Sequence, residues 1–343
     1  MLEEKDIKHV VDSLTDEEIL RFSGKTVLLV GSSGFLGRWF YDCLHDLNAN
    51  KLDNPCRIIS MDNNSPWSEQ TTSYRTHNIT DPLSDLSLGK VDFIINCAGI
   101  ASPEKYQQLP LETMDVSYLG TKNVLELARE SGTESILLFS SSEVYGTPIA
   151  EAIPTSEDYV GCIPTRGNRS CYDIGKQLLE TLAYIYFNKH NSPVKTVRPF
   201  NLYGPYMGTN DNRVLSNFMN NFIDGEPFKI YGDGKQTRTF CYAADGIAFF
   251  LKILLNGENG NVYNVGNPDP EVDMHELTKI FYDSFNKPYY YEVIDYPDSY
   301  PSDEPIRRCP DISKAQKTTG FTPSIDFKEG LKRMHEYYLS SRK

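Results

Sequence analysis

Short apolar segments alternate with longer segments of mixed polarity over the first two thirds of the chain. Residues 26–30, 57–61, 91–95 and 135–139 are rich in Val, Ile, Leu and Phe, with few polar positions. Strands that are buried on both faces of a parallel sheet have this composition, whereas strands with one wet face alternate apolar and polar residues. Alternation of such strands with helical segments predicts an α/β fold built on a doubly wound parallel sheet.

Three of the intervening segments are predicted to be helices, over residues 35–47, 113–130 and 243–255. A further strand at 194–198 follows the central helices, and a strand at 262–265 is expected to return to the main sheet. Right-handed crossovers bring the carboxyl ends of parallel strands to one edge, where ligands bind in such folds.

The pattern divides the chain into three parts. Residues 1–24 are predicted to form a polar helical extension that precedes the first strand and acts as an oligomer contact, a lid or surface cover. Residues 25–200 form the Rossmann-type, dinucleotide-binding domain, and 240–266 return to it. Residues 201–239 and 267–343 are rich in Asn, Gly, Pro and Tyr and are expected to form a smaller substrate-binding portion.

A glycine-rich loop directly follows the first predicted strand. Gly31, Gly34 and Gly37 permit a tight turn and a close approach of the backbone to a pyrophosphate. The helix then begins at Phe35 and Leu36, whose N–H groups are free to bind phosphate oxygens. A strand before the loop and a helix after it favour a dinucleotide site over an ordinary glycine turn.

The second strand ends at Asp62, where a carboxylate can accept hydrogen bonds from both ribose hydroxyls of an adenosine. A carboxylate there repels a 2′-phosphate, and Asn63 rather than an Arg follows it, so NAD is favoured over NADP. Asn78 and Ile79 are expected beside the adenine. Ala98 belongs to the small-residue end of the next strand, where the cofactor is expected to lie close.

Tyr172 and Lys176 are one turn apart on a predicted helix, so their side chains share a face. Ser141 follows the strand at 135–139 and is expected to lie opposite that face. Together they form a proton-transfer set, with Tyr as acid and base, Ser holding the substrate oxygen, and Lys lowering the pKa of the phenol.

Composition restricts the partners of this 343-residue chain. Its net charge of −13 argues against nucleic-acid binding, which needs a basic surface. No segment has the apolar length of a membrane span, and no cluster has metal-ligand spacing. The seven scattered cysteines predict reduced thiols and a cytoplasmic protein, and Cys171 is interpreted as a packed thiol rather than a nucleophile.

Over about residues 25–335 the chain resembles the extended short-chain dehydrogenase/reductase superfamily, on the glycine loop, Ser141 and the Tyr172-x-x-x-Lys176 pair. Within it, the chain is most similar to the UDP-glucuronate decarboxylases, also called UDP-xylose synthases. It is also similar to the decarboxylase domain of the bacterial enzyme that makes UDP-4-amino-arabinose. The phrases that carry this likeness lie at residues 101–103, 142–146, 169–173, 212–218, 234–238 and 308–312.

The resemblance implies that NAD oxidises C4 of a nucleotide-glucuronate, that C6 leaves as CO2, and that C4 is reduced again to give a nucleotide-pentose such as UDP-xylose. Related dehydratases carry Asp-Glu where this chain has Ser142-Glu143, and the decarboxylases have Ser-Glu. Glu143 is implied to be catalytic, near the carboxylate end of the sugar, with Ser142 at the substrate. A 4,6-dehydratase, a 4-epimerase and a non-catalytic NAD sensor remain alternatives.

The resemblance also implies how the substrate is held. Arg308 would bind the carboxylate, and Arg213 and Arg238 the diphosphate. Asn201 and Tyr231 would complete the nucleotide-sugar pocket. The resemblance does not decide whether the nucleotide is UDP, CDP, GDP or dTDP. A homodimer is expected, because members of the superfamily commonly dimerise through the helix that carries the Tyr.

Overall fold

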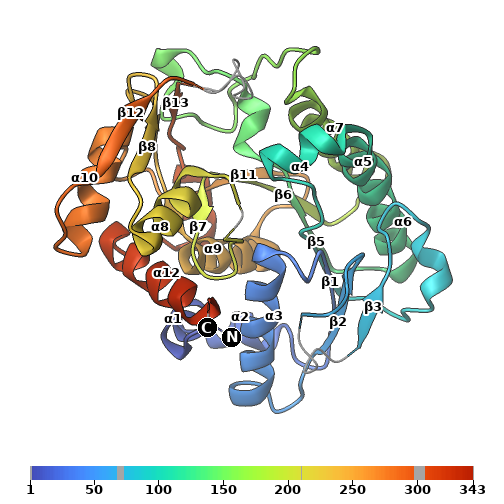
Figure 1. Cartoon of the computed structure of the whole chain (residues 1–343). Coiled ribbons are helices and arrows are strands. Elements are labelled where there is room, and N and C mark those ends of the chain that lie inside the picture. Colours follow the sequence, from blue (N-terminus) through green and yellow to red (C-terminus); the bar gives the residue numbers. More distant parts are fainter. Residues whose placement is uncertain (1, 68–72, 210, 297–305, 343) are drawn as a thin grey trace.

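A seven-stranded sheet forms the centre of the molecule (Figure 1). The computed structural model describes residues 2–67, 73–209, 211–296 and 306–342. The strand order is β11-β6-β5-β4-β1-β2-β3, and all neighbouring strands are parallel. The predicted doubly wound α/β fold is therefore confirmed.

The strands of the main sheet are β1 (Thr26–Val30), β2 (Arg57–Asp62), β3 (Tyr74–Thr76), β4 (Phe93–Asn96), β5 (Ser135–Phe139), β6 (Val194–Pro199) and β11 (Val262–Val265). Shorter strands pair outside it: β7 (Leu202–Tyr203), β8 (Phe228–Tyr231), β9 (Thr237–Arg238), β10 (Cys241–Tyr242), β12 (Tyr291–Ile294) and β13 (Arg307–Arg308). The longer helices are α3 (Phe35–Asn50), α6 (Thr121–Ser131), α7 (Ser170–His190), α8 (Val214–Asp224), α9 (Ala243–Asn256), α10 (Met274–Ser284) and α12 (Phe327–Ser341). The shorter ones are α1 (Glu4–Asp12), α2 (Asp16–Leu20), η1 (Leu83–Leu86), α4 (Pro103–Gln108), α5 (Pro110–Asp115), η2 (Val116–Gly120), η3 (Ser142–Tyr145), η4 (Ala150–Ala152) and α11 (Ser313–Thr319).

Both faces of the sheet are covered by helices, and successive residues of a strand enter different cores. Val27 and Leu29 of β1 join the core on the side of α3 and α9. Leu28 and Val30 join the core on the side of α6 and α7. A polar residue at any of these positions would be buried, which explains why the central strands are continuously apolar.

The predicted helices are present with small differences. α3 begins at Phe35 as expected, and α9 matches its predicted range within one residue. The segment expected as one helix over 113–130 consists of α5, the π-helical η2 and α6 in succession. β11 pairs with β6, so the chain does return to the main sheet. Among the described residues, no helix combines the length and the apolar character needed to cross a bilayer.

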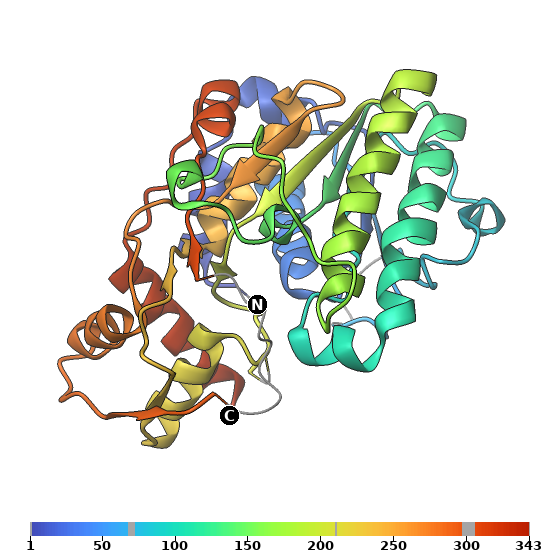
Figure 2. The same ribbon diagram turned by 90° about the horizontal axis from the view of Figure 1, so that it is seen from above.

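The C-terminal part contributes a smaller region beside the sheet. Helices α8 and α10 pack against β8, which pairs with β12, and α12 contacts both helices. Figure 2 shows this region to one side of the main sheet, away from α6 and α7. A second short pair, β9 with β13, lies between the region and the carboxyl ends of the central strands.

The N-terminal segment is not the polar appendage that its sequence predicts. It forms two helices rather than one, and α1 packs against α9 and α3. Val10 and Phe22 are completely buried in the core on that face. Buried ion pairs attach it as well: Glu18 accepts from Lys252 Nζ at 2.8 Å, and Asp6 accepts from Arg333 at 2.7 Å. Most residues of the segment are polar, so the sequence analysis did not recognise the few apolar residues that pack in the core beside α9.

We predict that Phe22→Ala lowers the free energy of unfolding by about 3–5 kcal/mol, because the ring leaves a cavity in the main core. Urea denaturation measures the change. Leu20→Ala is the matched control, because Leu20 is 63% exposed two residues away and should cost less than about 0.5 kcal/mol. Equal, small effects of the two substitutions would restore the view of residues 1–24 as an appendage.

Candidate active site

A cavity of about 320 Å³ lies at the carboxyl ends of β1, β4, β5 and β6. The glycine loop closes one end, and α7 and β13 contribute to the other. It brings together most of the residues that the sequence singles out, among them Gly31, Gly34, Phe35, Leu36, Gly37, Ser141, Ser142, Glu143, Tyr172, Lys176, Asn201, Arg213, Arg238 and Arg308.

The glycine loop has the shape that a dinucleotide phosphate requires. Gly31 has a φ of +76°, and a Cβ added there would lie 2.6 Å from the backbone nitrogen of Ala98. A Cβ on Gly37 would lie 2.7 Å from Cα of Ser32. α3 starts immediately after Gly34, with no acidic side chain in its first turn. The first residues of α3 line the cavity, and the N-terminal end of a helix attracts phosphate, so these residues fit a dinucleotide cofactor.

The predicted adenosine contacts lie beyond the cavity wall. Asp62 is buried at the end of β2, and its carboxylate accepts from the backbone N–H of Ser33 in the glycine loop at 2.9 Å. Neither Asp62 nor Asn63 lines the cavity, and the same holds for Asn78 and Ile79. The structure thus connects Asp62 to the loop, and the cofactor contacts of these four residues stay predictions.

Tyr172 and Lys176 are buried on one face of α7, beside Ser141 at the end of β5. Lys176 Nζ donates to the carbonyl oxygen of Phe139 at 2.7 Å and lies 5.6 Å from the centroid of the Tyr172 ring. Burial raises the pKa of Tyr172 to about 12, although a hydrogen bond with Ser141 lowers it. Burial also lowers the pKa of Lys176 to about 8. In this structure desolvation has a larger effect on the phenol than the groups that lower its pKa, so the net shift is upward. The effect of Lys176 on Tyr172 stays a prediction.

Tyr106 on α4 was not predicted. Its ring stacks on that of Tyr172, with centroids 5.3 Å apart and planes 19° from parallel. Sγ of Cys171 lies 3.4 Å from the carbonyl oxygen of Tyr106, and burial raises the pKa of this thiol. Cys171 therefore packs beside the phenol, as its interpretation as a packed thiol supposes. No sequence signal marks Tyr106, because the contact joins segments 66 residues apart.

Glu143 lies between two arginines. Arg308 donates from one nitrogen to Oε2 of Glu143 at 2.9 Å and from another to Oγ of Ser142 at 2.9 Å. Arg169 also donates to Oε2 of Glu143, and its Nε lies 3.7 Å from Asp173. Burial by itself raises the pKa of Glu143, but the charges of Arg308 and Arg169 outweigh it and lower the pKa. The carboxylate is thus held ionised and oriented.

Arg169 is a member of this cluster that the sequence analysis did not single out. It is buried at the start of α7, three residues before Tyr172, and lines the cavity. The run 169–173 was noted as a likeness, yet nothing local separates Arg169 from the exposed Arg166 nearby. The difference comes from the approach of η3 and β13, which place Glu143 and Arg308 against it.

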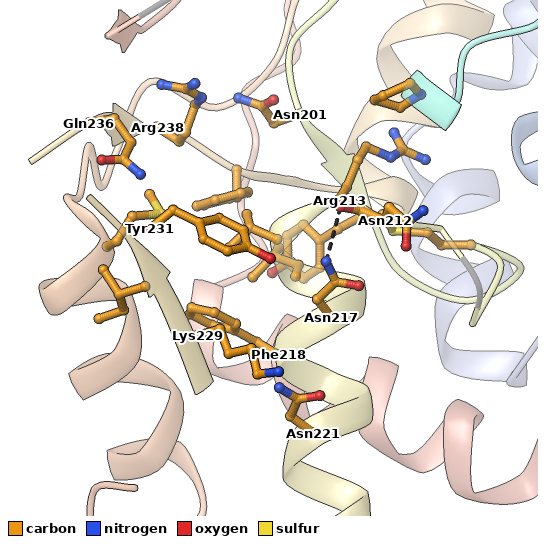
Figure 3. A pocket seen from close by; sticks show the side chains of 18 of the residues that line it. Asn201, Asn212, Arg213, Asn217, Phe218, Asn221, Lys229, Tyr231, Gln236 and Arg238 are labelled. Atoms are coloured by element: carbon orange, nitrogen blue, oxygen red, sulfur yellow. Dashed lines mark hydrogen bonds between the residues drawn. The ribbon is translucent and has the colours of Figure 1, made fainter. Parts of the chain in front are cut away.

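Arg213 and Arg238 lie where this cavity joins a second one of about 400 Å³. Asn201 lines both, and its amide donates to the carbonyl oxygen of Thr239 at 2.9 Å. Figure 3 shows Arg213 and Arg238 at one end of the second cavity and Tyr231 across its middle. The far end is lined by residues that were not predicted, among them Asn217, Phe218, Asn221 and Lys229.

Comparison with known proteins places this geometry in a family. Residues 27–266 match the model of the NAD dependent epimerase/dehydratase family. The chain is 36% identical over 317 residues to a protein of Arabidopsis thaliana called UDP-glucuronic acid decarboxylase 5, which covers 92% of this chain and 89% of the relative.

Solved structures share the fold at lower identity. Epimerase Mth375 from Methanothermobacter thermautotrophicus has a TM-score of 0.82 and 23% identity, over 95% of each chain. MoeE5, solved in complex with UDP-glucuronic acid and NAD, has a TM-score of 0.77 and 21% identity, over 93% of this chain and all of that one. At these identities the likeness shows the fold.

The burial of Lys176 predicts a pH dependence of stability. The folded state lowers the pKa of this ammonium to about 8 from the ordinary 10.5, so between these values the unfolded chain binds more protons. Stability contributed by Lys176 therefore rises with pH across that window. The unfolding free energy of the wild type minus that of Lys176→Met should grow by up to about 1.4 kcal/mol per pH unit. Urea denaturation from pH 7 to 10 measures it, and a flat or falling difference contradicts it.

Proposed function

Because the chain belongs to the NAD dependent epimerase/dehydratase family, we propose that it is an NAD-dependent decarboxylase that converts UDP-glucuronate into UDP-xylose and CO2. The proposal is supported by relatives called UDP-glucuronic acid decarboxylases, which are 33–39% identical over about nine tenths of the chain. UDP is preferred to the other nucleotides for the same reason.

The cluster of Glu143 with Arg169 and Arg308 is the observation that carries the proposal. Three arginines, Arg169, Arg238 and Arg308, stand against the two carboxylates of Glu143 and Asp173. This end of the cavity therefore has a net positive charge, which suits a sugar carboxylate. Ser142 Oγ is bound to Arg308, at the position where the dehydratases carry an acid. This chain thus offers no carboxylic acid there to expel a hydroxyl group from C6 as water.

The first chemical task is removal of the proton from the C4 hydroxyl. Bound NAD supplies the hydride acceptor at C4 and returns the hydride after decarboxylation, so there is no net redox change. Tyr172 takes the hydroxyl proton, and Ser141 donates a hydrogen bond to the same oxygen. Since burial holds the pKa of Tyr172 at about 12, ionisation needs a nearby cation, and Lys176 is the cation within the same face of α7.

Carbon–carbon cleavage follows from the ketone at C4. With a ketone at C4, the sugar is a β-keto acid. The bond between C5 and the carboxylate carbon C6 then breaks, and its electrons flow to the C4 oxygen. Tyr172 and Ser141 stand ready to donate to that developing oxyanion, at about 3 kcal/mol for a well-placed donor. The open oxygen of Glu143, Oε1, can hold the water that protonates C5, because the arginine contacts in the described structure are to Oε2.

The remaining site assignments follow the two cavities. Arg213 and Arg238, at their junction, bind the diphosphate, and Tyr231 and Asn201 border the nucleoside and sugar. In this division residues 25–200 with 240–266 hold NAD, and 201–239 with 267–343 hold the substrate.

We further propose that the protein is a cytoplasmic homodimer. All seven cysteines are free thiols, as expected in a reducing compartment. Leu111 on α5 is 72% exposed and Tyr184 on α7 is 63% exposed, so adjacent helices present apolar side chains to a second copy. Light scattering tests this, since one chain has a mass of 39.0 kDa; a monomeric mass contradicts the dimer.

Incubation with UDP-glucuronate and NAD tests the function directly. We expect release of CO2 and a UDP-pentose by mass spectrometry, without accumulation of NADH. Loss of water or an unchanged mass would instead indicate the dehydratase or the epimerase.

Tyr172→Phe should abolish turnover and leave NAD binding intact. An NAD sensor, by contrast, would show no turnover in the wild type or in the variant.

Arg169→Met should lower kcat/KM for UDP-glucuronate by about 100-fold, because Glu143 loses one of the two cations that orient it. The pKa of Glu143 should rise when that charge is removed, so activity is lost at a higher pH on the acid side. Arg166→Met is the matched control on the same loop, where the side chain is exposed. Equal kcat/KM values for the Arg169→Met and Arg166→Met variants would show that Arg169 has no specific role in turnover.

A further inference from the structure

A partly buried ion pair lies next to a residue that lines the catalytic cavity, Ser140. Glu180 is on α7, two turns after Tyr172, and Arg198 is on β6. Arg198 Nε donates to Oε1 of Glu180 at 2.8 Å and Nη2 donates to Oε2 at 2.6 Å. The two side chains are only 11% and 15% exposed. This bidentate pair joins the helix that carries the proton-transfer set to the central sheet.

The same pair holds both ends of the segment 140–146. At one end, Ser140 Oγ donates to Oε1 of Glu180. At the other end, Arg198 Nη1 donates to the hydroxyl of Tyr145 at 2.7 Å, and the guanidinium lies 4.7 Å from the centroid of that ring. Ser141, Ser142 and Glu143 lie between these two attachments.

Asn264 on β11 extends the attachment to a third strand. The hydroxyl of Tyr145 donates to Oδ1 of Asn264 at 2.7 Å. The amide of Asn264 donates in turn to the carbonyl oxygens of Thr155 and Asp311, each at 2.9 Å. Asp311 is three residues after Arg308, so the network also reaches the segment that delivers this arginine to Glu143.

We propose that Glu180 and Arg198 are positioning residues, which hold the segment 140–146 against α7 so that Ser141 and Glu143 keep their place opposite Tyr172. The inference deepens the proposed function, on which it rests for the reaction that is measured. A displacement of about 1 Å between reacting groups is enough to cost about 100-fold in rate.

The ion pair between Glu180 and Arg198 is expected to add little to the free energy of unfolding. Removing two charges from water costs as much as their attraction returns, and apolar residues of similar volume often serve a core equally well. The specific gain from Glu180 and Arg198 is directional, because the bidentate pair also binds the hydroxyls of Ser140 and Tyr145 and the carbonyl oxygen of Glu157. Directional hydrogen bonds of this kind hold a catalytic segment in one position, whereas apolar packing constrains its position less.

Two mild substitutions release the segment without leaving a buried charge unpaired. Ser140→Ala removes the attachment at one end, and Tyr145→Phe removes a single hydroxyl at the other. We expect each to lower kcat by about 3–10-fold, with KM for UDP-glucuronate changed less than about twofold. Ser135→Ala is the control, because Ser135 is buried at the opposite end of β5 and accepts from Lys195 at 2.8 Å. It should lower the Tm and leave kcat unchanged.

Glu180→Gln weakens the pair itself, and Glu18→Gln is its control in another buried ion pair, with Lys252. Both should lower the Tm, but only Glu180→Gln should lower kcat, measured well below the Tm of each variant. Wild-type kcat in the Ser140, Tyr145 and Glu180 variants overturns the proposal. The proposal is also overturned if kcat falls together with the Tm in the control variants, Ser135→Ala and Glu18→Gln, as much as it does in the test variants.

Hydrogen exchange gives a readout that does not depend on turnover. Amide exchange over residues 140–146 should quicken at least about tenfold in the Ser140→Ala/Tyr145→Phe double variant and stay unchanged in Ser135→Ala. If the wild type releases no CO2 from UDP-glucuronate, the proposed function fails, and this measurement still decides the positioning role. Unchanged exchange in the double variant overturns that role.

Discussion

Parallel pairing of the central strands is the constraint on which the site depends. Each strand must hydrogen-bond on both edges and bury both faces, so it has room for chemistry only where it ends. The pairing of β1 with β4, β4 with β5, and β5 with β6 aligns those ends at one edge. Gly31, Ser141 and Asn201 therefore reach a common cavity although 170 residues separate the first from the last.

Desolvation then determines which charges the cavity can hold. Tyr172 and Lys176 are buried, and burial shifts the pKa of each toward its neutral form. Glu143 is buried too, but two arginines keep its pKa low. The site thus combines a pair that can exchange protons with a carboxylate of constant charge, which suits a reaction with proton transfer at one carbon and a carboxylate at the next.

The second region of the molecule adds what the sheet lacks. β13 and β9 bring Arg308 and Arg238 over the carboxyl edge of the sheet, and the loop before α8 brings Arg213. A chain with a net charge of −13 repels anions at a distance, so in the proposed function these few placed cations provide the attraction for a diphosphate and a carboxylate.

Local periodicity and the backbone freedom of Gly31 and its neighbours are enough to predict the central strands, most of the longer helices around them and the glycine loop. The sequence also indicated Tyr172 and Lys176, since helical spacing is a local property. Contacts between distant segments bring apolar residues of 1–24 into the core and place Arg169 against Glu143, and neither can be predicted from local spacing. Tertiary contacts also bury Tyr172, and this burial raises its pKa above that of a free phenol. These outcomes depend on which distant segments exclude water from a side chain, and no spacing along the chain records that.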